Sequence, residues 1–184
     1  MSSSTGLREL LILRHAKSDH SDPTLADIDR PLSDRGREDA HKIGQWIAQQ
    51  QLHPDLIITS PAKRTLQTLR RARSYFDADG HISCMENSAV YESSHDTLLS
   101  VLAQTPTAPR TLLVGHNPGL ESLLTYLTED ARLQQEVKLF PTCALAQLVL
   151  PADWTTLSQG CAKLINLWQV KTLPLVADSL PSAR

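Results

Sequence analysis

The chain has 184 residues and a formal net charge of -2, and only 4% of its residues are aromatic. This composition argues against nucleic-acid binding through a basic face or through base stacking. No apolar run approaches the roughly 20 residues that span a bilayer, and the N-terminal residues lack the basic-then-apolar order of a signal peptide. We therefore expect one cytoplasmic domain over residues 1–184, bound to neither membrane nor nucleic acid, with a core at about 7–171 and frayed ends.

The first part of the chain predicts two strands and two helices. Residues 10–13 are uniformly apolar, which is typical of a buried parallel strand, and a polar loop rich in aspartate follows at 16–32. Ser33 is a predicted N-cap for a helix that extends to about Gln50. The second strand is expected at 55–59, and Ser60-Pro61 then predicts the start of the second helix.

The helices and strands after the second helix are predicted from the same capping residues and apolar patterns. Asn117 is expected to cap a helix in which Pro118 is the first residue, and the leucines from Leu120 to Leu127 form its buried face. The other expected elements are a strand at 81–85, a helix at 95–103 and strands at 112–114, 143–150 and 163–170. This succession predicts an α/β fold with three layers, in which a mostly parallel central sheet has helices on both faces.

The three cysteines, Cys84, Cys143 and Cys161, are far apart in the sequence. They lack Cys-x-x-Cys spacing and their number is odd, so buried free thiols are predicted rather than disulfides or a zinc site.

Basic and imidazole side chains directly follow the predicted strands. Arg14-His15 comes after the first strand, and His116 comes after the strand at 112–114. Arg64 lies in the first turn of the helix that follows the second strand. Because the carboxyl ends of parallel strands face one crevice, we expect these side chains to lie together. A nucleophilic imidazole among cationic donors predicts the transfer of a phosphoryl group from a dianionic substrate.

Each of these signals has a plainer interpretation when it is taken alone. Most histidines at strand ends satisfy a local hydrogen bond, and Arg64 is followed by Arg70, Arg71 and Arg73, which predict an exposed basic helix face. Arg64 differs from the last three because its position in the first turn is nearest to the expected crevice.

Four motifs occur in order along the chain. They are Leu13-Arg14-His15-Ala16, Arg30-Pro31-Leu32-Ser33-x-x-Gly36, Thr59-Ser60-Pro61-x-x-Arg64-x-x-Gln67-Thr68 and Gly115-His116-Asn117-Pro118. Together they resemble the histidine phosphatase superfamily, also called phosphoglycerate mutase-like, from about residue 10 to 127. The Arg-His-Ala-Lys-Ser form and the short chain are most similar to small phosphohistidine phosphatases of the SixA type. The family commonly has glycine where this chain has Ala16, a change that is tolerated if φ is negative there.

The resemblance implies a phosphoglycerate mutase-like fold and assigns roles to the four side chains. His15 would be the nucleophile that becomes phosphorylated, and Arg14, Arg64 and His116 would bind the phosphoryl oxygens. Such a transfer needs positioning and electrostatic stabilisation above all. We expect the second ring nitrogen of His15 to donate to a carbonyl, and His116 to be cationic when phosphate is bound. Lys17 and Asn117 are further candidates for phosphate binding.

No metal and no cofactor are expected. The histidines lack paired i, i+4 ligand spacing, and the aspartate-rich loop at 16–32 lacks the glycine and terminal glutamate of an EF-hand.

The expected general acid is Glu92. The family commonly places an acidic residue after the third strand, and Glu92 in Val90-Tyr91-Glu92-Ser93 matches this position best, with Glu86 as the second choice. An exposed glutamate without a function is the alternative interpretation.

The expected substrate is phosphohistidine on a protein, such as a histidine phosphotransfer domain. The mutases of the superfamily usually have a longer insertion between the positions of Arg64 and Glu92, and a shorter connection leaves a more open site. A small phosphomonoester is the alternative substrate. A phosphate-binding module without activity and a phosphoglycerate-type mutase are the competing functions.

Overall fold

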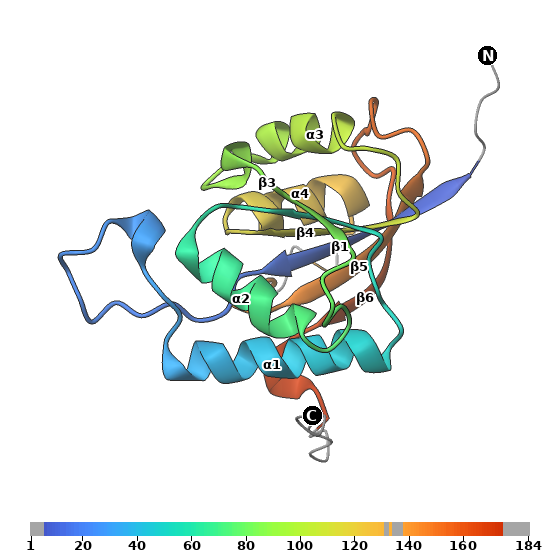
Figure 1. The fold of residues 1–184 in the computed structure, drawn as a ribbon. Coiled ribbons are helices and arrows are strands. Elements are labelled where there is room, and N and C mark those ends of the chain that lie inside the picture. The colour runs from blue at the N-terminus through green and yellow to red at the C-terminus, as the bar shows by residue number, and fades with distance from the viewer. Residues whose placement is uncertain (1–5, 131–132, 134–137, 175–184) are drawn as a thin grey trace.

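Residues 6–130, 133 and 138–174 are described by the structure, which is a computed structural model. Within them, six strands form one mixed sheet in the order β3-β2-β4-β1-β5-β6 (Figure 1). The strands are β1 (Leu7–Arg14), β2 (Leu56–Thr59), β3 (Ser83–Glu86), β4 (Arg110–Gly115), β5 (Leu145–Pro151) and β6 (Lys163–Trp168). The α-helices are α1 (Asp34–Gln49), α2 (Lys63–Arg73), α3 (His95–Ala103) and α4 (Gly119–Thr128). The ends that were expected to fray fall mainly on residues 1–5 and 175–184, outside the described residues.

Helices cover both faces of the sheet (Figure 1). In the central strand β1, Leu10 and Ile12 pack in a cluster with side chains of α3 and α4. Leu11 and Leu13, which point the other way, pack with side chains of α1 and α2. Because β1 is buried on both faces, its sequence shows no alternation of polar and apolar residues. This arrangement confirms the predicted three-layer α/β fold, in which β3, β2, β4 and β1 are parallel and β5 and β6 are antiparallel.

The register of the parallel strands aligns their carboxyl ends. Arg14 of β1 pairs with Gly115 of β4, and Thr59 of β2 pairs with Val114 of the same strand. The next residue of each strand continues the alignment, since the His15 N–H donates to the Gly115 carbonyl at 3.1 Å. The register therefore places the residues that follow β1, β2 and β4 at one edge of the sheet.

Helix α2 begins later than the Ser60-Pro61 signal predicted. Its first residue is Lys63 and its N-cap is Ala62, whose side chain makes no capping bond. Ser60 instead remains in line with β2, because its N–H donates to the Val114 carbonyl at 3.1 Å. The sheet therefore holds Ser60 at its edge, and the helix starts after it.

Helix α4 is also capped differently from the prediction. Pro118 occupies the N-cap position and Gly119 is the first helical residue, so Asn117 lies outside the helix. The Asn117 amide donates to the Phe140 carbonyl at 3.0 Å and to a Glu121 carboxylate oxygen at 2.9 Å. These two acceptors hold the side chain that was expected to cap the helix.

The last two strands differ from their predicted bounds. The strand expected at 143–150 begins at Leu145, because Cys143 has a φ of 63° and turns the chain. The strand expected at 163–170 ends at Trp168, and a short 3-10 helix, Val170–Thr172, follows it.

The prediction of buried thiols holds for Cys143 alone, since Cys84 is exposed and Cys161 is partly exposed. Cys84 lies in β3, an edge strand whose four residues are all exposed. Within the described part of the chain, every helix is too short or too polar to span a bilayer.

Candidate active site

His15 is a buried imidazole at the end of β1. Its Nδ1 lies 2.7 Å from the carbonyl oxygen of Ala16. A carbonyl only accepts hydrogen bonds, so Nδ1 carries the proton and Nε2 keeps its lone pair. The hydrogen bond expected for the second ring nitrogen is therefore present. Ala16 does not have a positive φ, so alanine can replace the glycine that is common at this position of the family.

The surroundings of His15 keep its ring neutral. Burial is the largest cause that lowers its pKa, to about 4, and the charges of Arg64, Arg14 and Arg30 lower the pKa further. The hydrogen bond to Ala16 acts in the opposite direction and is outweighed. Near neutral pH the ring is thus unprotonated at Nε2, which is the form that a nucleophile needs.

His116 lies beside His15. The centroids of the two rings are 5.1 Å apart, and the His116 Nε2 lies 2.8 Å from the hydroxyl oxygen of Ser60. Burial, followed by the proximity of His15 and Arg64, lowers the pKa of His116 to about 3. A dianionic ligand would favour the charged ring, in which Nε2 donates to Ser60 and Nδ1 is a second donor.

Arg64 is a buried guanidinium, 3% exposed, that α2 directs toward the two imidazoles. One of its terminal nitrogens donates to the backbone carbonyl of Asp27 at 2.6 Å, and the other donates to the Asp27 carboxylate at 2.9 Å. The guanidinium is thus clamped by a short 3-10 helix, η1 (Asp27–Asp29), from the loop after β1. The clamp fixes the orientation of Arg64 before any ligand binds.

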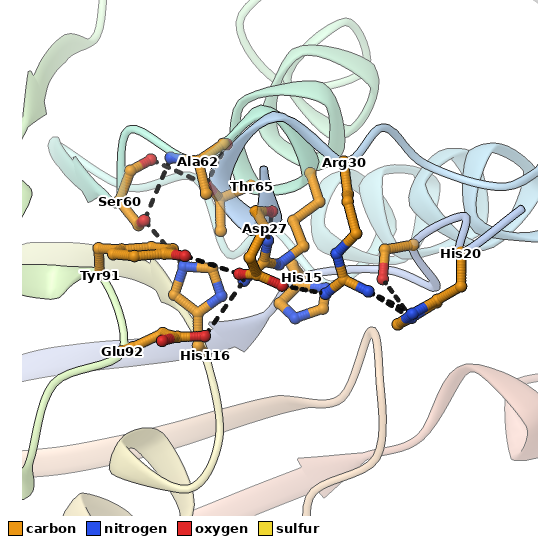
Figure 2. Close-up of polar contacts among 12 residues, drawn as sticks. His15, His20, Asp27, Arg30, Ser60, Ala62, Thr65, Tyr91, Glu92 and His116 are labelled. Atoms are coloured by element: carbon orange, nitrogen blue, oxygen red, sulfur yellow. Dashed lines mark hydrogen bonds and ion pairs between the residues drawn. The ribbon is translucent and has the colours of Figure 1, made fainter. Parts of the chain in front are cut away.

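The Asp27 carboxylate contacts three side chains of the site, those of Arg30, Arg64 and Tyr91. Figure 2 shows its carboxylate between Tyr91 and Arg30, near the imidazoles of His15 and His116. The Tyr91 hydroxyl donates to it at 2.6 Å, and Arg30 forms an ion pair with it at 2.5 Å. Burial acts to raise the pKa of Asp27, but the hydrogen bonds from Tyr91 and Arg64 outweigh it and lower the pKa to about 2. Asp27 is therefore a carboxylate near neutral pH.

Sequence reasoning missed the part that Asp27 plays, because nothing distinguishes it from the other aspartates of its loop. The sequence likewise offered no reason to place Tyr91 in the site. Its ring stands edge-on to His116 at 5.4 Å and 89°. The only sequence signal was the density of aspartates in a loop that follows the candidate nucleophile.

Arg14 and Asn117 meet on one acceptor. A terminal nitrogen of Arg14 donates to the Phe140 carbonyl at 2.8 Å, and the Asn117 amide donates to the same oxygen at 3.0 Å. Arg14 also lies near enough for its charge to lower the pKa of His15 and His116. The segment before β5 therefore anchors both side chains at the edge of the site.

The third motif holds the loops around the nucleophile. The Thr68 hydroxyl accepts a hydrogen bond from the Ala16 N–H at 3.0 Å and donates to the Arg64 carbonyl at 2.7 Å. The Gln67 side chain accepts from the Leu32 N–H at 2.8 Å. These contacts explain why Gln and Thr follow Arg64 at the positions they occupy.

The two remaining candidates lie at the margin of the site. A carboxylate oxygen of Glu92 is 3.9 Å from a terminal nitrogen of Arg64, and the side chain of Glu92 is 59% exposed. Lys17 is exposed, and its carbonyl accepts hydrogen bonds from the Ser33 N–H and hydroxyl, so its backbone is tied to the start of α1. Glu92 is thus close to the cationic centre, whereas the Lys17 side chain lines a neighbouring cavity with Arg14.

Buried nitrogen atoms without hydrogen-bond partners gather on the predicted phosphate-binding side chains. Among the described residues, six buried side-chain nitrogens lack a partner, and three of them belong to these side chains: Nε of Arg14, Nε of Arg64 and Nδ1 of His116. The other three are Nε of Arg30 and the indole nitrogens of Trp46 and Trp154. Few buried polar atoms lack a partner in a native protein, and each one that does needs an explanation. Three of them around a neutral imidazole fit a ligand that accepts hydrogen bonds and carries negative charge.

Comparison with known proteins agrees with this geometry. The model of the histidine phosphatase superfamily, branch 1, matches residues 10–83. A solved structure of a candidate phosphohistidine phosphatase SixA from Agrobacterium tumefaciens is 29% identical, with a TM-score of 0.75 over 88% of this chain and 97% of that chain. This chain belongs to the histidine phosphatase superfamily. The resemblance inferred from the four motifs is thereby confirmed.

Two further proteins are similar to this chain over most of their lengths. A candidate SixA from Nakamurella multipartitia is 26% identical, with a TM-score of 0.74, and the match covers 89% of this chain and 96% of that chain. An uncharacterized protein of Mycobacterium tuberculosis is 31% identical over 160 residues, which are 84% of this chain and 97% of the relative. The likeness therefore extends well beyond the residues of the family model.

The surroundings of His15 predict an unusual titration. In the free protein, we expect the ring to take up a proton with a midpoint of about 4, because burial disfavours the charged form. The unfolded chain takes up this proton near 6.5, so the free energy of unfolding should fall as the pH falls between these values. Nuclear magnetic resonance of the ring nitrogens, assigned with the His15→Ala variant, measures the midpoint. A midpoint near 6.5 would contradict the burial argument.

Proposed function

We propose that this superfamily member is a metal-independent phosphatase that carries the phosphoryl group covalently on His15. The observation behind the proposal is the set of three buried, unpartnered nitrogens on Arg14, Arg64 and His116, next to an imidazole held neutral. Phosphoryl oxygens are acceptors for these donors, and their charge is balanced by the two guanidiniums. The same donors supply the positive charge that metal ions provide in other phosphoryl-transfer enzymes.

The proposed reaction has two steps. In the first, the Nε2 lone pair of His15 attacks phosphorus, and the bond from phosphorus to the leaving oxygen or nitrogen breaks. The leaving atom keeps the electron pair and takes up a proton. The Ala16 carbonyl accepts from Nδ1–H and stabilises the positive charge that develops on the ring. In the second step, water attacks phosphorus, the phosphorus–Nε2 bond breaks with its electron pair returning to the ring, and inorganic phosphate leaves.

Arg14, Arg64 and His116 would stabilise the charge on the phosphoryl oxygens in both steps. Because Asp27 already orients Arg64 through two hydrogen bonds, little reorganisation of that side chain is needed at the moment of transfer. A cationic His116 would donate through Nδ1 while Ser60 accepts from Nε2. Asp27 is then a positioning residue in this mechanism.

We propose phosphohistidine on a protein, such as a histidine phosphotransfer domain, as the substrate. Two structures that resemble this chain are candidate phosphohistidine phosphatases. The connection from α2 to α3 holds only the short strand β3 and the 3-10 turn Ser88–Val90, which supports an open site. The imidazole of phosphohistidine also leaves readily once protonated, so it needs little help from a general acid. The cytoplasmic location stays a prediction from the sequence.

A small phosphomonoester is the second candidate, and the position of Glu92 favours it. A carboxyl group 3.9 Å from Arg64 is near enough to the cationic centre to serve an alcohol leaving group, which needs a proton.

Substrate comparison tests the proposed function. Phosphate release is measured from a phosphohistidine-bearing protein domain and from p-nitrophenyl phosphate, each with and without EDTA. The proposal predicts that the phosphoprotein has the higher kcat/KM and that EDTA has no effect. Turnover of the aryl phosphate alone would favour small phosphomonoesters. Tight phosphate binding with no turnover of either substrate would favour a binding module, and conversion between positional isomers of a phosphorylated acid would favour a mutase.

The Glu92→Gln variant tests the general acid. We expect alkyl phosphate hydrolysis to slow by about 10²-fold, the lower end for loss of general acid catalysis, because an alkoxide leaves poorly without a proton. Phosphohistidine and aryl phosphate should be hydrolysed at nearly unchanged rates. Glu38→Gln is the matched control, since Glu38 is an exposed glutamate of α1. Equal effects of Glu92→Gln on all three substrates would remove Glu92 from the mechanism.

A further inference from the structure

A cavity of about 490 Å³ lies beside the candidate active site and shares Arg14 with it. Its volume is in the range of pockets that bind small molecules or ligand groups. The lining comes from the loop after β1, the first turns of α1 and α4, and the segments that precede β5 and follow β6. Five cationic side chains line it, those of Arg14, Lys17, Arg35, Lys138 and Lys171.

Among the described residues that line the cavity, cationic side chains outnumber carboxylates by five to two. Of its two carboxylates, Asp39 lies 3.6 Å from Arg35, and Glu121 accepts a hydrogen bond from Asn117 at 2.9 Å. Within the described residues, no carboxylate lies within 4.0 Å of the ammonium groups of the three lysines. The whole chain carries a net charge of -2, so the excess of positive charge is local to this face. A local excess of this kind attracts anions.

The geometry links the cavity to the phosphoryl site through Arg14. One terminal nitrogen of this guanidinium is held by the Phe140 carbonyl, while its charge acts on both His15 and His116. Phe140 and Arg14 both line the cavity, so the Arg14 side chain is common to the cavity and the candidate active site. An anionic group in the cavity would therefore lie next to the phosphoryl group bound at His15.

We propose that this cavity is a second anion subsite, which binds a carboxylate group of the same substrate molecule that delivers its phosphoryl group to His15. This inference rests on the proposed function. The favoured source of the carboxylate is an acidic side chain near the phosphohistidine of a protein substrate. A small phosphorylated carboxylic acid offers the same chemistry.

Binding to the His15→Ala protein tests the subsite without turnover. The probes are two phosphohistidine peptides that differ only in the residues next to phosphohistidine, glutamate in one and glutamine in the other. When His15→Ala is the only substitution in the protein, the glutamate peptide should bind more tightly than the glutamine peptide. Adding Lys138→Ala and Lys171→Ala, two exposed lysines, should weaken its binding roughly three- to tenfold, the range for two exposed ion pairs, and leave the binding of the glutamine peptide unchanged. Lys42→Ala, an exposed lysine of α1 outside the cavity, is the control.

A second pair of probes distinguishes the source of the carboxylate. Phosphoglycolate and ethyl phosphate differ by one carboxylate, and a lysine-dependent preference confined to this pair would assign the subsite to small phosphorylated acids. Equal affinity of the double lysine variant and its parent for every acidic probe would overturn the subsite. The turnover of p-nitrophenyl phosphate by the double lysine variant, with His15 intact, should match that of the native protein. If the native protein itself did not hydrolyse p-nitrophenyl phosphate, the proposed function would be refuted instead.

Discussion

The His15→Ala variant is expected to lose phosphatase activity by at least about 10³-fold, since removal of a covalent nucleophile has effects of this size or larger. The structure gives His15 the features of that nucleophile: a fixed tautomer, a pKa lowered to about 4 and three cationic neighbours. The change removes a ring next to His116 and leaves the backbone bonds of the strand end in place. Steady-state hydrolysis of p-nitrophenyl phosphate measures the loss.

His81→Ala is the matched control, because His81 is exposed and lies in the connection between α2 and β3. We expect this variant to keep full activity. Circular dichroism of both variants should match that of the native protein. An active His15→Ala protein would mean that another group attacks phosphorus, and His116, the neighbouring imidazole, would then be examined first.

The Arg64→Ala variant is expected to lower kcat/KM by about 10² to 10³-fold, the loss measured when one preorganised donor to a developing anion is removed. Arg64 contributes its charge and its unpartnered Nε to the site, and it is one of the three side chains that contact the Asp27 carboxylate. Arg64→Lys should recover little of the loss, because an ammonium group lacks the planar fork that reaches both Asp27 and a phosphoryl oxygen. Kinetics on the aryl phosphate provide the measurement.

Arg70→Ala controls for the charge of the helix. Arg70 lies on the same helix, α2, and is exposed, so its removal changes the net charge equally. A similar fall in kcat/KM for Arg64→Ala and Arg70→Ala would show that general electrostatic attraction, rather than contact with the phosphoryl group, explains the role of Arg64.

The central part of the site could be predicted because local rules decide it. An apolar run such as 10–13 is buried on both faces, and parallel strands end at one edge, so the residues that follow them have to meet. His15, Arg64 and His116 are brought together in this way. Their positions depend on where each parallel strand ends, and the ends of the apolar runs indicate these points.

The surrounding network could not be predicted because it depends on long-range contacts. Asp27 reaches Arg64 across 37 positions of sequence and Tyr91 across 64, and no spacing in the sequence connects them. The predicted N-termini of α2 and α4, which were based on Ser60 and Asn117, were wrong for a related reason. Both side chains had strong local preferences for a cap, but tertiary partners, His116 for the first and Phe140 for the second, hold them elsewhere.

Trapping the phosphoryl group on the enzyme tests directly whether His15 carries it. The native protein is mixed in EDTA with a radiolabelled phosphohistidine-bearing domain, quenched in alkali at early times, and digested for mass spectrometry. If His15 is the nucleophile, an alkali-stable, acid-labile label should be found on the peptide that contains His15, and it should form before free phosphate. Phosphate release without any label on His15, or a label on another residue, would contradict this role of His15.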